Sequence, residues 1–353
     1  MTPDWYIAEL AAPGEAKLIS AIAPCRNERT HIEEFFGSAL AQQLPPDWRL
    51  ELLIADGISD DGTRAVLEEY AAHDARLVVL DNPQRIVSTG LNAALRRARG
   101  CVIARLDIHT RFAPDYLAEC IAALARTGAD NVGGPWVARG QGAAGRAIAA
   151  AFQCRWVVGG ARSRDVQYEG PVDTVYLGCW RREALARAGG FDETLVRNQD
   201  DEHNLRLRRA GSSVWQSARI RSAYQPRGAL RQLWAQQYQY GYWRAFVLRR
   251  HGAPGAWRQL VPAAFVAALI VWSMAAPWCA APLLGLLVAY GAYLIAASIS
   301  AARAAPEKSA AMLLRLPVAI ALYHTGYGAG FWRGLWDVLR GKAGSAEAAR
   351  LTR

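Results

Sequence analysis

Short apolar runs alternate with amphipathic segments through the first two thirds of the chain. Each apolar run is long enough for one buried strand, and the segments between them carry apolar residues at helical spacing. Polar turns that contain glycine, such as Ser59–Thr63, join the two kinds of segment. Strands that alternate with helices through short loops predict an α/β domain with a mostly parallel, doubly wound sheet. We expect strands at 17–24, 50–55, 77–80, 101–106 and 172–178, and helices at 31–42, 63–73, 90–98 and 182–188.

The last third of the chain has a different pattern, because no charged residue stands between Arg258 and Arg303. Soluble helices rarely stay uncharged over such a length, and a helix needs about 20 apolar residues to cross a bilayer. We therefore expect two membrane spans, at Leu260–Ala276 and Pro282–Ser300. Basic residues flank the outer ends of this pair, so the positive-inside rule predicts that the preceding domain and residues 301–315 are cytoplasmic.

Two neighbouring segments have an intermediate character. Residues 316–331 are apolar but short, and they contain a proline, a histidine and several glycines. We expect them to form a re-entrant or interfacial segment, because a crossing would place the basic tail outside, against the positive-inside rule. Residues 229–250 mix aromatic and arginine side chains without an acid, which favours a helix in the membrane interface. A helix packed into the core with a basic outer face is the alternative.

The formal net charge of +10 is unevenly placed. Residues 204–260 hold eleven arginines and no acid, and this basic belt runs directly into the uncharged spans. That order indicates an anionic membrane surface as partner and argues against nucleic acid. The six cysteines have no metal-ligand spacing, which is typical of free thiols in a reducing cytosol. The first residues lack the basic and apolar pattern of a cleaved signal peptide.

An acid and a histidine stand two residues apart where the fourth strand ends. Side chains at positions i and i+2 point the same way, so Asp107 and His109 can reach one cation. In open α/β sheets, ligands bind at the carboxyl ends of the strands. A carboxylate oxygen with an imidazole suits Mn²⁺ or Mg²⁺ beside a phosphate-bearing ligand. Taken alone, the pair is also explained by a capping or core role.

Acids also stand at two other predicted element ends. Asp56 closes the second strand, where it can cap a turn or accept a hydrogen bond from a nucleotide base or ribose. The chain has neither a GxGxxG turn after its first strand nor a Walker loop, which excludes Rossmann-dinucleotide and P-loop sites. Asp200, Asp201 and Glu202 open a helix, whose positive end favours acids and is a sufficient structural reason for them.

Three ordered motifs resemble the nucleotide-sugar half of family 2 glycosyltransferases. They are Pro24-x-x-Asn27-Glu28, Asp56 with Ser59-x-Asp61-Gly62-Thr63, and Asp107-x-His109. The resemblance covers residues 17–255 and implies a GT-A fold that uses a nucleoside-diphosphate sugar and a divalent cation. It implies that Asp56 contacts the base, whereas Asp107 and His109 hold the metal and the diphosphate. Further donor-site candidates are Pro24, Asn27, Glu28, Arg85 and Asn92.

The chain departs from the family pattern at Gly57 and His109, each of which stands where an acid is usual. Because imidazole is a competent Mn²⁺ ligand, this interpretation retains the metal. Arg206-Leu207 and Ala210-Gly211 fit the pattern Glu-Asp-x-Asp-Leu-x-x-Arg-Leu-x-x-Ala-Gly, which places Asp200 at the catalytic aspartate. Inverting sugar transfer needs one carboxylate to take the proton of the acceptor hydroxyl. The resemblance therefore implies Asp200 as the base, with Asp201 as the alternative, although Gln199 replaces a usual Glu.

Further stretches resemble the members of that family that assemble succinoglycan, an exopolysaccharide. This likeness implies a UDP-sugar donor, inversion of configuration and a polyprenyl-diphosphate-linked saccharide acceptor. It also implies the bacterial inner membrane as location and other exopolysaccharide assembly proteins as partners. The Gln-x-x-Arg-Trp motif of processive synthases is missing, which favours the addition of a single sugar. The stretches are 82–92, 129–135, 172–178, 197–202 and 239–243.

We expect a catalytic domain at 17–225, a basic, aromatic interfacial region at 226–258, and membrane-associated helices with a basic tail at 259–353. Two other classes of protein stay open. A membrane-tethered scaffold that binds nucleotide sugars without catalysis would explain Gly57 and Gln199 as losses. A nucleotidyltransferase would need a Gly-rich basic signature near the first strand, which this chain does not supply.

Overall fold

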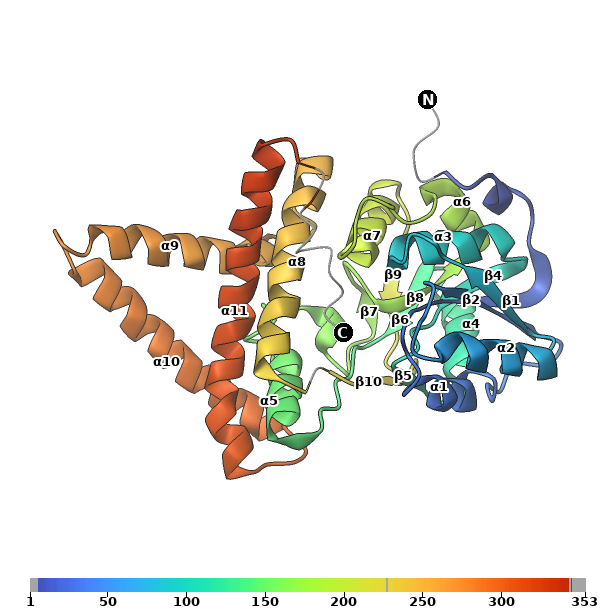
Figure 1. Ribbon diagram of the computed structural model, residues 1–353, viewed down its shortest axis with the longest axis horizontal. Coiled ribbons are helices and arrows are strands. Elements are labelled where there is room, and N and C mark those ends of the chain that lie inside the picture. Colours follow the sequence, from blue (N-terminus) through green and yellow to red (C-terminus); the bar gives the residue numbers. More distant parts are fainter. Residues whose placement is uncertain (1–5, 227, 343, 345–353) are drawn as a thin grey trace. The chain divides into compact units, whose positions relative to one another are not determined.

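The computed structural model of this protein describes residues 6–226, 228–342 and residue 344 (Figure 1). These residues form two compact units. The first contains the described residues up to Val137 together with Asp165–Tyr224. The second contains Ala138–Arg164 together with the described residues from Gln225 onward. The second unit is therefore assembled from two stretches that lie far apart in the sequence.

An eight-stranded sheet forms the centre of the first unit (Figure 1). Its strands are β1 (Glu15–Cys25), β2 (Arg49–Asp56), β3 (Leu77–Asp81), β4 (Gly100–Arg105), β6 (Asn131–Gly134), β7 (Gly170–Pro171), β8 (Tyr176–Arg181) and β9 (Val214–Gln216). They are ordered β3-β2-β1-β4-β8-β6-β9-β7. The first four pair in parallel, and β8 runs antiparallel to both of its neighbours. The predicted mostly parallel α/β sheet is confirmed, with β8 and β7, which run antiparallel to their neighbours, as the departures.

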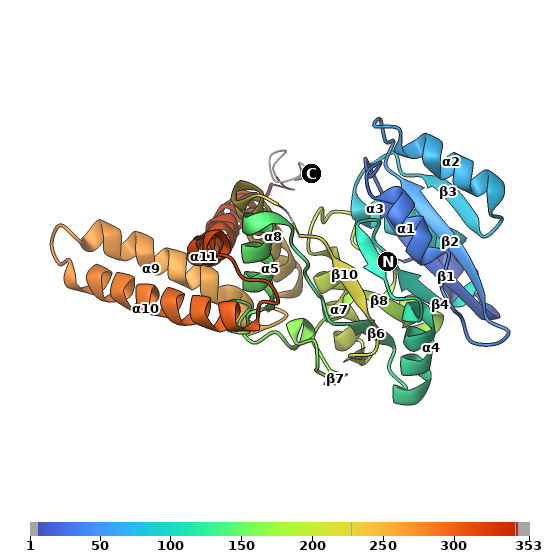
Figure 2. The same ribbon diagram turned by 90° about the horizontal axis from the view of Figure 1, so that it is seen from below.

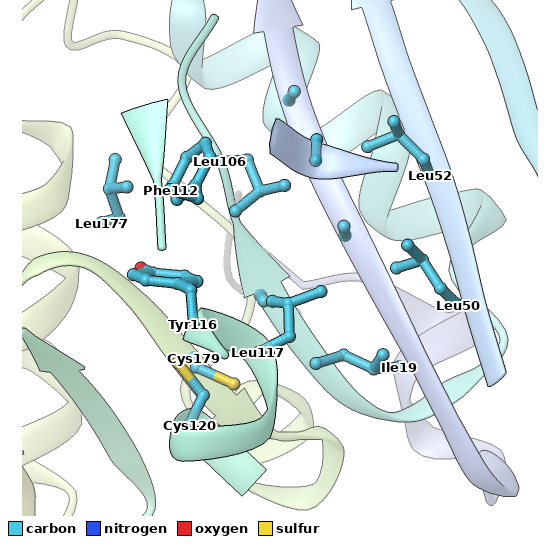
Figure 3. Close-up of a cluster of buried hydrophobic side chains, with 14 of the residues drawn as sticks. Ile19, Leu50, Leu52, Leu106, Phe112, Tyr116, Leu117, Cys120, Leu177 and Cys179 are labelled. Carbon is cyan, nitrogen blue, oxygen red and sulfur yellow. The ribbon is translucent and has the colours of Figure 1, made fainter. Parts of the chain in front are cut away.

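Helices cover both faces of this sheet. Along β2, Leu50 and Leu52 belong to the apolar cluster that includes α1, α2 and α4, whereas Leu53 belongs to the cluster that includes α3, α6 and α7. This alternation follows from the two-residue period of a strand. Figure 3 shows part of the first cluster, in which Tyr116 and Leu117 of α4 lie beside the sheet. The helices are α1 (Ile32–Ala39), α2 (Thr63–His73), α3 (Val87–Arg97), α4 (Tyr116–Thr127), α6 (Arg182–Ala188) and α7 (Gln199–Arg209).

The predicted helices at 63–73 and 182–188 match α2 and α6, and the other two differ at their ends. The first unit also holds a small second sheet of β5 (Thr110–Phe112) and β10 (Ser222–Tyr224), which pair antiparallel. A short 3₁₀ helix at Ala8–Ala11 precedes β1. The β5–β10 pair contributes to the site. It places Tyr224 of β10 beside Thr110 of β5, which follows shortly after β4.

Two long helices dominate the second unit. α8 (Leu230–His251) and α11 (Ala310–Leu339) lie side by side in both views (Figures 1 and 2). Gly326, Gly330 and Gly334 recur every four residues on α11 and lie against the carbonyl oxygens of Trp234, Tyr238 and Tyr242 of α8. Small residues at this spacing let two helix backbones approach closely. A β-carbon added at Gly330 would overlap the Tyr238 carbonyl oxygen.

Packing against α11 buries part of residues 229–250. The buried residues of α8 include Leu233, Tyr242 and Trp243, while Arg249 and Arg250 at its end are exposed. The helix therefore packs along α11 with a basic, exposed C-terminal end, and its position in the membrane interface stays a prediction. α11 runs unbroken through 316–331, although Pro317 lies inside it. This continuity excludes a re-entrant turn there, and an interfacial position of the segment stays a prediction.

α9 (Val261–Ala275) and α10 (Ala281–Ala304) form an apolar hairpin (Figure 2). A 3₁₀ turn at Trp257–Leu260 precedes α9. The candidate membrane spans are Trp257–Ala275, with 19 residues, and Ala281–Ala304, with 24 residues. At about 1.5 Å per residue both are long enough for the hydrocarbon core of a bilayer. Few of their residues are buried, as expected of surfaces that face lipid.

The segment after Val137 becomes a helix, α5 (Gly142–Gln153), in the second unit. Its buried side includes Ile148 and Phe152, and it packs mainly against α11. The Phe152 and Tyr323 rings meet edge to face, with centroids 5.8 Å apart. This stretch of the sequence, which is rich in Gly and Ala, is thus part of a helical core. A 3₁₀ turn at Arg162–Arg164 then leads back to the first unit.

Candidate functional site

The site lies in the first unit, where β1, β2 and β4 reach their carboxyl ends. Two loops at this edge are joined by hydrogen bonds. The Asn27 backbone N–H donates to the Ser59 hydroxyl at 2.9 Å, and the Asn27 side-chain amide donates to the Asp60 carboxylate at 2.9 Å. The Glu28 backbone N–H donates to the Thr63 hydroxyl at 2.9 Å. The first two predicted motifs therefore form one braced surface.

Backbone strain gathers at the same edge. Asn27, Ile58 and Arg85 follow the ends of β1, β2 and β3, and each has a positive φ, of 53°, 55° and 63° respectively. Such angles are uncommon for residues other than glycine and cluster at functional sites. Ile58 and Arg85 are also exposed. These three positions are an observation, independent of the motifs, that makes this edge a candidate binding surface.

Asp56 is almost fully buried at the end of β2. Its carboxylate accepts hydrogen bonds from the Ser59 hydroxyl at 2.5 Å and from the Ser59 backbone N–H at 3.3 Å. Arg64 Nη1 lies 3.7 Å from Asp56 Oδ2 and also pairs with Asp81 at 2.6 Å. Asp56 thus shapes the loop after β2, and its contact with a nucleotide base stays a prediction.

The end of β4 carries a buried ion pair. Arg105 is only 6% exposed, and it grips Asp107 with Nε at 3.1 Å and Nη2 at 3.2 Å. Its third nitrogen, Nη1, is buried and has no hydrogen-bond partner among the described residues. A buried donor left in this state costs roughly 1–3 kcal/mol. The site therefore contains a buried nitrogen, Arg105 Nη1, whose N–H groups have no acceptor among the described residues.

Histidine 109 lies beyond this ion pair. His109 Nδ1 is 3.8 Å from a Glu28 carboxylate oxygen, so the first and third predicted motifs meet. The imidazole also contacts the Tyr224 ring, with centroids 5.3 Å apart. Asp107 and His109 both keep some exposure, with side chains 14% and 16% accessible. They can therefore be reached by a ligand at the strand end.

Asp200 enters the site from the first turn of α7. Of the three acids there, Glu202 is fully buried and pairs with Arg206 at 2.9 Å, which gives it a structural role. Burial and the neighbouring charge of Asp201 raise the pKa of Asp200, and the positive charge of Arg105 partly offsets this rise. Arg105 is therefore close enough to act on Asp200 as well as on Asp107.

Tyrosine 176 completes this group. β8 pairs antiparallel with β4 through Ala104 and Cys179, so β8 begins, at Tyr176, on the edge of the sheet where β4 ends. The Tyr176 hydroxyl is 2.7 Å from the Thr110 hydroxyl. Burial, and after it the charge of Asp107, raises the pKa of Tyr176 well above its ordinary value. Arg105, Asp107, Tyr176 and Asp200 form one electrostatic group, called here the β4-end cluster.

The rings of Trp136 and Tyr224 lie beside the Tyr176 ring of the β4-end cluster and form one aromatic group with it. Trp136 and Tyr224 lie 4.8 Å apart and Trp136 and Tyr176 lie 5.9 Å apart, measured between ring centroids. The Trp136 and Tyr224 rings are mostly buried. Flat apolar rings beside charged groups are suited to packing against the C–H face of a sugar. This makes the aromatic group a second part of the candidate site.

The remaining predicted residues lie in different settings. Asn92 is buried, and its amide donates to the Phe191 carbonyl at 2.8 Å and to Glu193 at 2.9 Å, while its oxygen accepts from the Phe191 backbone N–H. The structure therefore brings Asn92 to the loop before α7 and not to the β4-end cluster. Pro24 lies within β1 next to Ala55. The donor-binding roles of Asn92, Pro24 and Arg85 stay predictions.

Sequence reasoning missed Arg105 and the aromatic group. A signal for Arg105 was present, since a lone arginine interrupts an apolar strand just before Asp107. The three aromatic residues stand at positions 136, 176 and 224, and no spacing rule connects them. Their meeting depends on the reversed direction of β8 and on the β5–β10 pair.

The chemistry of the donor set fits a divalent cation that is shared with a ligand. Asp107 offers carboxylate oxygens, which keep a second lone pair each while they accept from Arg105. His109 adds an imidazole nitrogen. Among the described residues, no group of three His, Cys, Asp or Glu side chains is placed to hold a metal ion. Diphosphate oxygens would therefore have to complete the coordination.

Comparison with known proteins places this fold and site in context. The model of glycosyl transferase family 2 matches residues 20–186. The succinoglycan biosynthesis protein ExoA of Rhizobium meliloti (strain 1021) is 31% identical over 334 residues, which are 90% of this chain and 95% of that protein. The Methanococcus voltae dolichyl N-acetyl-alpha-D-glucosaminyl phosphate 3-beta-D-2,3-diacetamido-2,3-dideoxy-beta-D-glucuronosyltransferase is 24% identical, over 90% of this chain and 97% of that protein.

Among solved structures, a mannosyltransferase from Pyrobaculum calidifontis, determined in complex with GDP-Man and Mn²⁺, has the same fold. Its TM-score is 0.55 at 20% identity, and the match covers 95% of this chain and 91% of that one. The predicted GT-A type of α/β fold is thereby confirmed. The likeness to ExoA extends over nearly the whole of both chains, beyond the segment that the family model matches. This chain belongs to glycosyl transferase family 2.

Proposed function

We propose that this protein is an inverting glycosyltransferase that moves one sugar from a UDP-sugar to a polyprenyl-diphosphate-linked saccharide in exopolysaccharide biosynthesis. The observation that carries this proposal is the β4-end cluster, which brings the candidate metal acid Asp107 and the candidate base Asp200 to one arginine. The enzyme class comes from family membership. The name of the 31% identical relative supports the pathway.

The chemistry follows from the two acids. Asp200 takes the proton of an acceptor hydroxyl, and the hydroxyl oxygen attacks the anomeric carbon of the donor sugar from the side opposite the diphosphate. The new C–O bond forms while the bond to the diphosphate breaks, so the configuration is inverted. Asp107 and His109 would hold a Mn²⁺ or Mg²⁺ ion, which stabilises the charge of the leaving diphosphate when it is bound. Asp201 is the alternative base.

The membrane part of the proposal rests on the second unit. We propose that residues 17–225 are catalytic, that 226–258 meet the membrane interface, and that 259–353 hold the membrane helices and tail. Exposed Trp257 and Trp278 lie at opposite ends of the first apolar span, where indole side chains favour the bilayer interface. Arg258 and Arg303 flank the hairpin on its outer ends. These residues support a bacterial inner membrane protein with its catalytic domain in the cytoplasm.

The test is release of nucleoside diphosphate by the full-length protein in nanodiscs with Mn²⁺, from a panel of UDP- and GDP-sugars. A bacterial lipid extract serves as the acceptor. We expect release from one UDP-sugar that depends on the extract. Donor binding without release under any acceptor condition would instead support the noncatalytic scaffold. The absence of donor binding would contradict the proposed function as a whole.

His109 gives a specific expectation for the cation. Replacing His109 by Ala removes one of two protein ligands, so Mn²⁺-dependent donor binding should weaken by about tenfold or more. Donor affinity is measured by titration calorimetry with and without Mn²⁺. His73→Ala, on an exposed residue at the end of α2, is the matched control. An unchanged response to Mn²⁺ would remove His109 from the ligand set.

The pKa of Asp200 gives an expectation for pH. A base must be ionised to accept a proton, and burial together with Asp201 raises the pKa of Asp200 above the ordinary 3.8. The rate should therefore fall with decreasing pH around a midpoint above 3.8. Asp201→Asn removes the neighbouring negative charge, so it should move that midpoint to lower pH. Rates are measured across the acid range, and loss of all activity in Asp201→Asn would instead identify Asp201 as the base.

A further inference from the structure

Arg105 has a guanidinium nitrogen that makes no hydrogen bond to the described residues. Two of its three guanidinium nitrogens grip Asp107, and Nη1 is buried without a hydrogen-bond partner among the described residues. Arginine keeps its charge even when it is buried. Burial disfavours that charge, yet the carboxylates of Asp107 and Asp200 together raise the pKa of Arg105. A permanent cation with one buried guanidinium nitrogen unpaired is unusual inside a protein, and it indicates that a ligand supplies the acceptor.

The position of Arg105 restricts what that ligand group is. Its guanidinium is bonded to Asp107 on one side and lies within electrostatic range of Asp200 and Tyr176. In the proposed reaction, the leaving diphosphate lies next to Asp107 and the attacking hydroxyl lies next to Asp200. Attack from behind requires these two groups to lie on opposite sides of the anomeric carbon. The transferred sugar ring is therefore the part of the substrates that lies between the two acids.

We propose that Arg105 is a specificity-determining residue, whose Nη1 donates a hydrogen bond to an oxygen of the transferred sugar. This inference rests on the proposed function and adds to it the residue that distinguishes one donor sugar from another. A site built to bond a particular hydroxyl discriminates strongly against a sugar that lacks it, because the buried donor is then left unpaired. The Trp136 and Tyr176 rings, whose centroids lie 5.9 Å apart, would form the apolar surface beside that sugar.

A purely structural role of Arg105 makes a different prediction. If it only orients Asp107, its replacement should weaken the binding of the nucleoside diphosphate and of the nucleotide sugar by the same factor. If Nη1 contacts the sugar, the affinity for the nucleotide sugar should fall by a larger factor than the affinity for the nucleoside diphosphate. The informative quantity is therefore the ratio of the two dissociation constants. This ratio is a binding measurement and does not require turnover.

The experiment uses the full-length protein in nanodiscs with Mn²⁺, the nucleotide sugar selected by the donor panel, and its nucleoside diphosphate. Arg105→Lys keeps the charge but cannot hold Asp107 and reach a second acceptor at once. We expect Arg105→Lys to weaken the nucleotide sugar about tenfold more than the nucleoside diphosphate. Arg187→Lys, which changes an exposed ion pair with Asp130, is the matched control and should leave the ratio unchanged.

Donor analogues that each lack one sugar hydroxyl then identify the contact. In the parent, loss of one particular hydroxyl should weaken binding about tenfold, and in Arg105→Lys the same loss should have little effect. Arg105→Gln serves as a second variant. If neither variant folds, as judged by thermal unfolding, the binding of the analogues to the parent protein is the test. Binding that is insensitive to the loss of every single hydroxyl would overturn the inference.

The outcomes separate this inference from the proposed function. Equal weakening of both ligands in the Arg105 variants, or no coupling to any hydroxyl, overturns the role of Arg105 while leaving the glycosyltransferase intact. A parent protein that binds no member of the panel instead removes the proposed function and the inference with it. A ratio that changes in Arg105→Lys and stays constant in Arg187→Lys supports both.

Discussion

Replacing Asp200 by Asn is expected to reduce sugar transfer by about 10²–10⁴-fold while the nucleotide sugar still binds. Asparagine has nearly the same shape as aspartate but cannot accept the proton of the acceptor hydroxyl. The first turn of α7 should persist, because the buried Glu202–Arg206 pair and the Asn204–Asn131 hydrogen bond of 2.7 Å hold this helix in place. The loss should therefore fall on kcat, with donor affinity kept within a few fold.

The measurement compares nucleoside diphosphate release and donor binding in the parent, Asp200→Asn and Asp201→Asn. Glu183→Gln, an exposed acid-to-amide change on α6, is the control for an unspecific effect of lost charge. Full activity in Asp200→Asn would contradict its assignment as the base. Activity that disappears only in Asp201→Asn would move the assignment by one residue and keep the mechanism.

Replacing Gly330 by Leu should separate α8 from α11 and lower the thermal stability of the second unit. A side chain at this position overlaps the carbonyl oxygen of Tyr238, which belongs to the backbone and cannot rotate away. Overpacking of a well-packed core typically costs about 1–3 kcal/mol, and a backbone clash in a long helix pair belongs at the upper end of that range. The loss should spread along the pair, since Gly326 and Gly334 make equivalent contacts.

Thermal unfolding and limited proteolysis in detergent measure this effect. Gly285→Leu on α10 is the matched control, because a β-carbon there meets nothing within 4 Å. The control should unfold at the parent temperature, and the Gly330 variant should unfold well below it. Equal unfolding temperatures of the two variants would show that the close approach of α8 and α11 is unimportant for stability.

Local patterns were enough to predict the parallel strands of the sheet and the edge at which the candidate residues follow them, and the function of that edge stays a prediction. Apolar strands such as 50–55 end in polar loops, and the parallel order of β1 to β4 brings those loops to one edge. Asp107 and His109 could be paired from sequence because they share one strand end. Glu28 joins His109 because β1 and β4 are neighbours in the sheet.

What the sequence could not reveal depends on contacts between distant segments. Tyr176 reaches Asp107 only because β8 enters the sheet in the opposite direction. Asn92 belongs to a motif that suggested donor binding, yet its amide is used by the Phe191 backbone 99 positions later. The Gly- and Ala-rich segment around 140–153 has no strong local preference, and its helix is fixed by packing against α11. Tertiary packing decides such cases.

The second unit is assembled from two stretches that lie far apart in the sequence, and this has a consequence for its synthesis on the ribosome. α5 leaves the ribosome more than 150 residues before α11, its main packing partner, begins at Ala310. At typical translation rates this interval lasts roughly 10–30 s. During that time the apolar side of α5, with Ile148 and Phe152, is without the helix that finally covers it. Ribosome-bound chains that stop before α11 should therefore depend on a chaperone or a membrane surface to stay unaggregated.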